Sequence, residues 1–393
     1  MSSSFDISRA RAETRACENV IHLNNAGSSL MPIPVADYLV DFLRLEEEIG
    51  GYESVEKEAE ALDNFYISAG KLINCNPLEI AYAENATRAW DMAFYGLTFK
   101  PGERILTTMS EYGSNVIAYN QQAERYGVDV VFVPDDEHGQ IDVGALKDLI
   151  DDRVRLISIS QIPTGGGLVN PAAEVGKVAK DAGVLYLLDA CQGVGHVPID
   201  VEEIGCDMLS ATGRKFLRGP RATGFLYVRD SVMDQVVPPL LDQHAADLIS
   251  PGEYKMLDSA KRYENWEQFF AGKAALGVAM DYAMEWGIEA IRDRIFSLAN
   301  GLRNKLSQID GVEITDQGKV KCGIVTFRSS KLDAYTIKSE MKKRKINVNV
   351  SDGSGTLVSF QQRNIESVVR SSVHYFNTEE EIDTFVDALK EVL

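Results

Sequence analysis

Five short, mostly apolar runs alternate with helical patterns between residues 104 and 229, and this alternation limits the folds open to the chain. The runs that we predict as strands are RILTTM (104–109), DVVFV (129–133), VRLISIS (154–160), VLYLLD (184–189) and GFLYVR (224–229). The helical patterns between them include NVIAYNQQAERYG and AAEVGKVAKDAG, and the second ends in a glycine that can stop a helix. Strands that are apolar almost throughout and are separated by helices predict an α/β fold, with a mostly parallel sheet covered on both faces.

The pattern changes after residue 265. Apolar residues at steps of three and four from Ile291 to Leu306 predict a long amphipathic helix. Further strands (323–327, INVNV and VVRSSVHYF) and a helix near 332–343 follow, and Thr378 begins a capping box for a final helix. We therefore predict an N-terminal arm (1–20), a large α/β domain (21–275) and a smaller C-terminal α+β domain (276–393).

Charge and cysteine content restrict the partners and the compartment. The 393 residues include 59 acidic and 40 basic side chains, and the net charge of −19 disfavours nucleic acid or an anionic membrane as a partner. The chain has no apolar run of 18 residues, and its start has no apolar signal core. The five cysteines are scattered and never form a CxxC pair, which favours reduced thiols over disulfides or a metal site. We expect a cytoplasmic protein without a metal.

Several common catalytic motifs are missing. The sequence has no GxxxxGK[ST], no HExxH and no GxSxG. Gly193 and Gly195 start a dinucleotide pattern, but Pro198 stands where its third glycine belongs. A zinc hydrolase, a serine hydrolase and a simple dehydrogenase are therefore disfavoured.

Two candidate reactive residues lie at or near the ends of predicted strands. Asp189 closes VLYLLD, and the carboxyl ends of parallel strands face the ligand crevice, although a capping role explains this residue equally well. Lys215 comes later in the chain, and a lysine used for imine chemistry must be partly desolvated or close to other cations. Arg214 and Arg218 would lower the pKa of Lys215 and could bind a phosphate. A solvated basic turn is the commoner explanation for such a loop.

Three further segments complete a set of groups. Asn85-Ala86-Thr87 begins a helical stretch, where free amides and a hydroxyl suit a phosphate, although such residues are usually only caps. Tyr112 follows the strand at 104–109 and offers a flat face, and the glycines of 163–167 let backbone approach a ligand. An acid for a pyridinium nitrogen, an amine for an aldehyde, a phosphate cup and a stacking ring are together what pyridoxal 5′-phosphate (PLP) requires. We predict PLP as the cofactor.

With these residues in view, the chain resembles the class V aminotransferases, a family of fold-type I PLP enzymes that includes cysteine desulfurases. The resemblance extends from HLNNAG (22–27) through Val369-Arg370 to NTEEE (377–381), and it is most specific over 187–229. That segment is most similar to the branch of isopenicillin-N-epimerase-like proteins and the sulfoxide C–S lyases of ergothioneine biosynthesis. The resemblance implies a fold-type I architecture and a homodimer with active sites between two subunits.

The resemblance also implies roles for individual residues. Lys215 would carry the cofactor aldehyde and act as the catalytic base. The other cofactor contacts would be Asp189 at the ring nitrogen, Gln192 at the ring hydroxyl, Thr164 near the ring oxygen, Tyr112 stacked on the ring, and Thr87, Thr212, Arg214 and the Ala86 backbone at the phosphate. Arg370 would bind the substrate carboxylate, Asn25 is a further candidate substrate contact, and Trp266 or Asn265 is expected to reach a partner subunit's phosphate.

The predicted reaction depends on a missing thiol. The desulfurases use a reactive cysteine on a loop before the C-terminal arginine, but the loop at 350–356 has none, and Cys322 precedes a buried strand where thiols are usually inert. We therefore predict β-elimination at a C–S bond of a cysteine S-conjugate or its sulfoxide, giving pyruvate and ammonia. Transamination and epimerisation of an amino acid are the alternatives because they share the early steps, and desulfuration is less favoured. A scaffold without catalysis is disfavoured because Lys215, Asp189 and Arg370 are all present.

Overall fold

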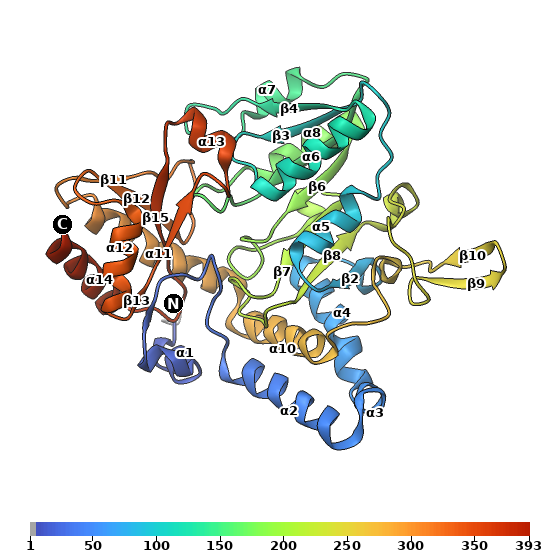
Figure 1. Cartoon of the computed structure of the whole chain (residues 1–393), viewed down its shortest axis with the longest axis horizontal. Helices are drawn as coiled ribbons and strands as arrows, with labels where there is room; N and C mark the ends of the chain where they lie inside the picture. The colour runs from blue at the N-terminus through green and yellow to red at the C-terminus, as the bar shows by residue number, and fades with distance from the viewer. Residues whose placement is uncertain (1–4) are drawn as a thin grey trace.

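A seven-stranded sheet forms the centre of the larger part of the molecule (Figure 1). The computed structural model describes residues 5–393. Five neighbouring strands of this sheet are parallel, and β8 is antiparallel to both of its neighbours, β2 and β7. In spatial order the strands are β2 (Ile80–Ala83), β8 (Gly224–Val228), β7 (Met208–Thr212), β6 (Leu185–Asp189), β5 (Val154–Ser160), β3 (Arg104–Thr108) and β4 (Asp129–Val133). The predicted α/β fold with a mostly parallel sheet is confirmed.

Helices cover both faces of this sheet. Neighbouring residues along an interior strand belong to different hydrophobic clusters, as Leu188 and Leu187 of β6 do, so this strand is buried on both sides. The edge strand β4 is only partly buried. The cluster around Leu187 includes residues of α5 (Ala86–Phe94) and α6 (Gly113–Tyr126). The cluster around Leu188 includes residues of α4 (Ala59–Ile73), α7 (Val143–Asp148), α8 (Ala172–Ala182) and α10 (Phe270–Trp286).

A smaller antiparallel sheet lies at the other end of the molecule. Its strands, in spatial order, are β11 (Val312–Ile314), β12 (Ile324–Ser329), β15 (Ser367–Ser372) and β14 (Asn349–Asp352). Helices α11 (Ile288–Leu306), α12 (Ala334–Lys343), α13 (Leu357–Gln362) and α14 (Glu379–Val392) belong to the same part. Strand β1 (Ile21–His22) pairs with β13 (Ile346–Asn347), which joins the N-terminal segment to the C-terminal part. The predicted domain boundary at 275–276 falls inside α10.

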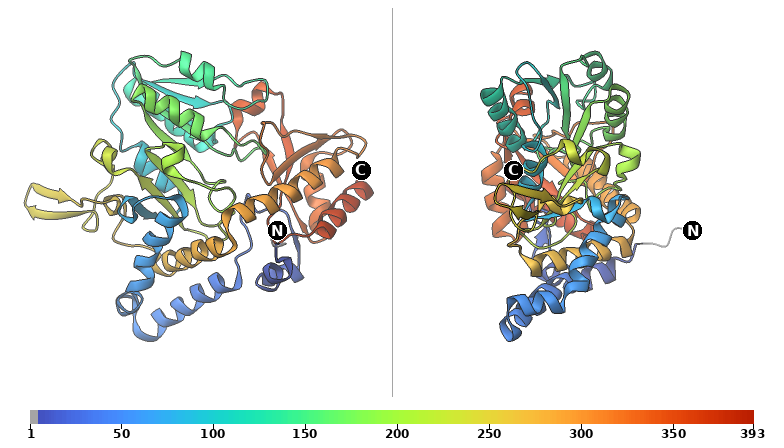
Figure 2. Two further views of the ribbon diagram at one scale, coloured as in Figure 1. Left: turned by 180° about the vertical axis from the view of Figure 1, so that it is seen from behind. Right: turned by 90° about the vertical axis from the view of Figure 1, so that its right-hand side faces the viewer.

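Several peripheral elements were not identified from the sequence. Helices α1 (Ile7–Ala12), α2 (Ile33–Ile49), α3 (Gly51–Lys57) and α9 (Val201–Ile204) are among them. A hairpin of β9 (Ala246–Ser250) and β10 (Glu253–Met256) projects from the body next to the large sheet (Figures 1 and 2). Across residues 5–393, no helix combines the length and the apolar character needed to cross a bilayer.

Candidate active site

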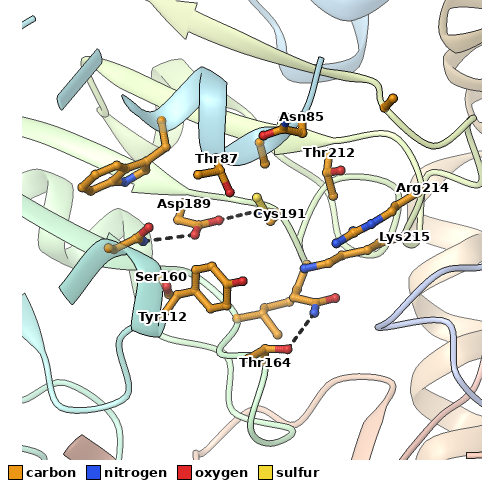
Figure 3. Close-up of a pocket in the computed structure, with 16 residues that line it drawn as sticks. Asn85, Thr87, Tyr112, Ser160, Thr164, Asp189, Cys191, Thr212, Arg214 and Lys215 are labelled. Atoms are coloured by element: carbon orange, nitrogen blue, oxygen red, sulfur yellow. Dashed lines mark hydrogen bonds between the residues drawn. The ribbon is translucent and has the colours of Figure 1, made fainter. Parts of the chain in front are cut away.

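A pocket lies at the carboxyl ends of the parallel strands, next to the N-terminus of α5 (Figure 3). Ser160 and Asp189 are the last residues of β5 and β6, and Thr212 is the last residue of β7. Because these parallel strands end at one edge of the sheet, their terminal side chains are brought together. Most of the site residues predicted from the sequence line this pocket: Ala86, Thr87, Tyr112, Thr164, Asp189, Gln192, Thr212, Arg214 and Lys215.

The N-terminus of α5 forms one end of the pocket. The Asn85 side chain accepts a hydrogen bond from the Arg88 backbone N–H at 2.9 Å, and it caps the helix. The N–H groups of the first helical turn carry partial positive charge and suit an anion. In the same pocket, Nη1 of Arg214 is buried and has no hydrogen-bond partner within residues 5–393. A phosphate group at this end would supply the partner that Arg214 lacks, so the residues present fit the phosphate of PLP.

Lys215 follows β7 and is only partly exposed, within the pocket. Burial lowers the pKa of its ammonium to about 8, and the charges of Arg214 and Arg370 lower the pKa as well. Cys191 and Asp189 act in the opposite direction. A lysine with this pKa has about a tenth of its amine free at pH 7, far more than an ordinary lysine, and the free amine is the form that bonds to the PLP aldehyde.

The expected role of Arg218 beside Lys215 is contradicted by the structure. The backbone of Arg218 is left-handed, with a φ of 60°, and its side chain is turned away from the pocket. Its guanidinium donates hydrogen bonds to Leu30 O (2.8 Å), Thr14 Oγ1 (2.6 Å) and Tyr375 Oη (2.5 Å). Arg218 therefore fastens the N-terminal segment and the C-terminal part to the lysine loop. Of the two arginines proposed as phosphate ligands, only Arg214 reaches the pocket.

Asp189 is a buried carboxylate with a fixed orientation. Its Oδ1 accepts a hydrogen bond from the backbone N–H of Cys191 at 2.9 Å, and its Oδ2 accepts one from Asn115 Nδ2 at 3.2 Å (Figure 3). Asn115, Cys191 and Ser160 line the pocket and were missed in the sequence analysis. Their positions offered a signal, because Ser160 ends a predicted strand and Cys191 lies two residues beyond the end of another.

Arg370 comes from β15 of the small sheet and approaches the pocket through Thr164. Its Nη1 donates hydrogen bonds to Thr164 Oγ1 at 2.6 Å and to Thr164 O at 3.1 Å. Gln192 Nε2 also contacts Thr164 Oγ1, at 3.4 Å. Burial lowers the pKa of Arg370 to about 10, and the Arg214 charge contributes. The buried Nε of Arg370 has no partner within residues 5–393, so one donor is left for a carboxylate.

Three predicted residues are not among those that line this pocket: Arg370, which approaches it through Thr164, and also Asn25 and Trp266. Asn25 is fully buried, and its amide donates to His22 O and Ser372 O and accepts from Ser29 Oγ. Its side chain is thus occupied by protein groups. Trp266 is 54% exposed, and its backbone N–H donates to Asp242. An exposed side chain is available to a second subunit, so the partner contact proposed for Trp266 stays a prediction.

The loop at residues 352–356 packs against the same end of the fold. Gly113 N donates to Gly355 O at 3.0 Å, and a Cβ added to Gly355 would lie 2.9 Å from Thr164 Cγ2. This loop holds Ser354 and no cysteine. Among the five cysteines, Cys191 alone lines the pocket, and burial raises the pKa of its thiol well above the ordinary value. Its thiol is therefore uncharged and a poor nucleophile.

Comparison with known proteins identifies the family. A sequence model described as aminotransferase class-V matches residues 21–385. The chain belongs to this family. A probable cysteine desulfurase of Methanothermobacter thermautotrophicus is 28% identical over 379 residues, which cover 95% of this chain and 94% of that relative. The apo structure of a cysteine desulfurase from Thermococcus onnurineus NA1 has a TM-score of 0.93 at 23% identity and covers 100% of this chain and 99% of that one. A C-DES structure with glycine covalently linked to its PLP cofactor has a TM-score of 0.87 at 20% identity, over 97% and 99% of the two chains.

These matches confirm a PLP-dependent enzyme of fold-type I and contradict the predicted reaction. We predicted C–S β-elimination, with transamination or epimerisation as alternatives and desulfuration less favoured. Three curated relatives that align over nearly the whole chain are named as cysteine desulfurases, two of them as probable ones. The error lies in the argument from the loop at 350–356. A missing thiol there excludes a sulfur acceptor on that loop. It does not exclude desulfuration of cysteine with a thiol elsewhere as the acceptor. The matches do not distinguish a branch within the family.

Proposed function

We propose that this protein is a PLP-dependent cysteine desulfurase, which converts L-cysteine to L-alanine and passes the sulfur to a thiol. Its similarity to cysteine desulfurases over nearly the full length of both chains supports this activity. The observation that carries the proposal is that Arg370 donates a hydrogen bond to Thr164, which lines the same pocket as Lys215. The charge of Arg370 also lowers the pKa of Lys215. An amine and a carboxylate-binding group beside one pocket suit an α-amino acid.

The residues that would hold the cofactor fall into three groups. The start of α5, Thr212 and Arg214 would bind the phosphate. Asp189 would face the ring nitrogen, and Tyr112 would stack on the ring. Gln192 fits the ring hydroxyl, because its buried Oε1 has no hydrogen-bond partner within the described part of the chain. When bound, PLP supplies a sink for the electrons released as bonds at the substrate α-carbon break.

Lys215 and Arg370 would act on the substrate itself. Arg370 binds the cysteine carboxylate through its free donors, and Thr164 holds the guanidinium in place. Because its pKa is about 8, Lys215 Nζ is able to accept the proton from the α-carbon near neutral pH. The loop at 352–356 packs close to this site, where Gly355 O accepts a hydrogen bond from Gly113 N.

The sulfur would pass to a thiol other than Cys191, whose raised pKa keeps it uncharged and a poor nucleophile. The Cβ–S bond of cysteine breaks, an S–S bond to the acceptor forms, and the acceptor's thiol hydrogen ends on the alanine methyl group. The carbon gains the two electrons that the two sulfur atoms lose, so no external oxidant or reductant is needed. Ser354 on the nearby loop is no substitute, because a hydroxyl does not form a persulfide. We propose an external thiol as the acceptor, in a cytoplasmic homodimer whose partner subunit contributes Trp266.

Product analysis tests this function. The PLP-loaded protein is incubated with L-cysteine and increasing dithiothreitol, and alanine, sulfide and pyruvate are measured. We expect alanine and sulfide in equal amounts, at a rate that rises with the thiol and is lost in Lys215→Ala. Ser354→Cys places a thiol on the loop, and we expect it to give one turnover of alanine per site without added thiol.

The products also show where the proposal fails. Pyruvate and ammonia without alanine would contradict desulfuration. Complete conversion of substoichiometric cysteine to alanine by the unmodified protein, with no other thiol present, would refute the external acceptor while leaving desulfuration intact.

A further inference from the structure

Glu111 is a buried carboxylate to which the reaction above assigns no role. It lies between β3 and α6, and only 1% of its surface is exposed. Six hydrogen bonds converge on its two oxygens within 3.4 Å, far more than a carboxylate needs for satisfaction. Oε1 accepts from Tyr112 N (3.0 Å), Asn115 Nδ2 (2.9 Å) and Ser160 Oγ (2.5 Å), and Oε2 accepts from Ser160 N (2.9 Å), Thr107 Oγ1 (3.1 Å) and Thr108 Oγ1 (3.4 Å).

The pattern of donors requires a carboxylate at this position. Each oxygen of Glu111 accepts from a backbone N–H that has no freedom to rotate: Tyr112 N on Oε1 and Ser160 N on Oε2. A glutamine would have to point its own NH₂ at one of these two donors, whichever way its amide is turned. An amide of the same shape therefore leaves a buried donor without an acceptor, and this lowers the stability of the folded protein.

Asn115 connects this carboxylate to the site. Its Nδ2 donates one hydrogen bond to Glu111 Oε1 at 2.9 Å and a second to Asp189 Oδ2 at 3.2 Å. The two N–H bonds of one planar amide thus bridge two buried carboxylates. The other oxygen of Asp189 is held by the backbone N–H of Cys191. The plane of the Asp189 carboxylate is fixed by these two contacts, of which only Asn115 depends on a side chain.

The electrostatics agree with this arrangement. Burial raises the pKa of Glu111, and the charge of Asp189 raises it as well, so the two acids interact. Asn115 places a donor on each of them and offsets part of their repulsion. Glu111 also binds the backbone of Tyr112, which lines the same pocket.

We propose that Glu111 is a positioning residue for the cofactor ring, acting through Asn115 to aim the Asp189 carboxylate at the pyridine nitrogen. The alternative is a purely structural role, in which Glu111 only gathers the ends of β3, β5 and α6. The two differ in one respect. A positioning role affects the contact with the ring nitrogen specifically, whereas a structural role affects every contact with the cofactor equally.

Binding of two cofactor forms to the apoprotein separates these roles. PLP and its 1-deaza analogue, in which a CH replaces the ring nitrogen, share the aldehyde, phosphate and hydroxyl. The ratio of their dissociation constants therefore measures the contact at the nitrogen. We expect Asn115→Ala to reduce the preference for PLP by about tenfold, the usual effect of losing a hydrogen bond to a charged group. Asp189→Ala gives the ratio of dissociation constants that is expected when the contact with the ring nitrogen is absent.

A matched control tests for general loosening of α6. Tyr119→Phe, on the same helix, removes a buried hydrogen bond to Ser158 Oγ of 2.8 Å without touching Glu111 or Asp189. We expect this variant to keep the wild-type ratio. If Asn115→Ala weakens both cofactor forms by the same factor, the positioning role is wrong.

A double-mutant cycle tests whether Glu111 acts through Asn115. Glu111→Gln should lower the ratio in the wild-type background and have no further effect on it in Asn115→Ala. Equal effects of Glu111→Gln in both backgrounds would overturn the proposed route. If Glu111→Gln does not fold, Glu111→Asp replaces it, because its shorter carboxylate loses the contact with Asn115. The measurement uses no cysteine, so its outcome is independent of the reaction proposed above.

Discussion

Thr164 Oγ1 accepts a hydrogen bond of 2.6 Å from Nη1 of Arg370, and this bond links the two sheets of the molecule at the active site. Thr164 follows β5 of the large sheet, whereas Arg370 lies on β15 of the small sheet. The direction of the guanidinium therefore depends on a residue from the other sheet. A second bond, from the same nitrogen to the Thr164 carbonyl, is independent of the side chain.

Removing the Thr164 hydroxyl should weaken substrate binding more than catalysis. Thr164→Val keeps the shape and the backbone carbonyl but leaves Arg370 held by one bond. We expect KM for cysteine to rise about tenfold, with a smaller change in kcat, because the carboxylate contact exists before and during the reaction. Steady-state kinetics measures both. Thr164→Ser, which retains a hydroxyl, should stay close to the wild type, and a fall in kcat at constant KM would contradict this role.

Arg218 and Arg214, four residues apart, should respond differently to substitution. Arg218→Ala removes a guanidinium that bonds Thr14, Leu30 and Tyr375, and it leaves buried groups without partners. We expect a loss of about 3 kcal/mol in the free energy of unfolding of the apoprotein, measured by urea titration. Arg214→Ala should change this free energy little and weaken PLP binding instead. The opposite pairing of effects would show that Arg218, and not Arg214, serves the phosphate.

The core of the site could be predicted from the sequence because it follows the strands. Asp189 ends an apolar run that we predicted as a strand, and parallel strands bring such residues to one edge of a sheet. Lys215 was identified from the residues around it, because β7, the strand that precedes it, was not among the predicted strands. The direction of a side chain is a different matter. Arg218 turns away from its neighbour Lys215 because of one left-handed backbone angle, which no periodicity reveals. The Asn25 side chain donates to backbone groups that are distant in the sequence, such as Ser372 O, and its amide is therefore not free for a substrate.

The contacts of Glu111 were beyond sequence analysis for a related reason. An acid next to a predicted strand reads as a solvated residue, because charged side chains are rarely fully buried. Its burial depends on donors from β5, which lies 49 positions further along the chain at Ser160. The reaction is less predictable still. Residues such as Lys215 are shared by elimination, transamination and desulfuration, and a single loop without a thiol was not sufficient to decide among them.

A side chain at Gly113 should displace the loop at 352–356. A Cβ added there would lie 2.2 Å from Ser354 O, a backbone atom that has to move to make room. We expect Gly113→Ala to reduce kcat/KM for cysteine at least tenfold, because the shifted loop no longer packs beside Thr164. Gly51→Ala is the control, since nothing lies within 4 Å of its added Cβ. Full activity of Gly113→Ala would show that the position of the loop does not matter for the reaction.

The low pKa of Lys215 should appear in the stability of the apoprotein. The folded protein holds this lysine at a pKa of about 8, below the ordinary value of 10.5, so between these values the unfolded chain binds more protons than the folded one. The contribution of Lys215 to stability therefore rises with pH above about 8, and at lower pH the buried charge is a constant penalty. Other buried groups also titrate in alkaline solution, so the useful quantity is a difference between two variants.

Lys215→Met removes the amine and keeps an apolar chain of similar length. We expect the apoprotein of this variant to be more stable than the wild type at neutral pH. The difference in their free energies of unfolding, here called the gap, should shrink by about 2 kcal/mol between pH 8 and about pH 10. Urea unfolding of both proteins across that range measures the gap at each pH, with tyrosine and cysteine titrations cancelling between them. Because the wild type binds no cofactor in this experiment, the result reports on the amine alone. A gap that stays constant would mean that Lys215 titrates at its ordinary pKa, and the free amine proposed for proton transfer would then be scarce at neutral pH.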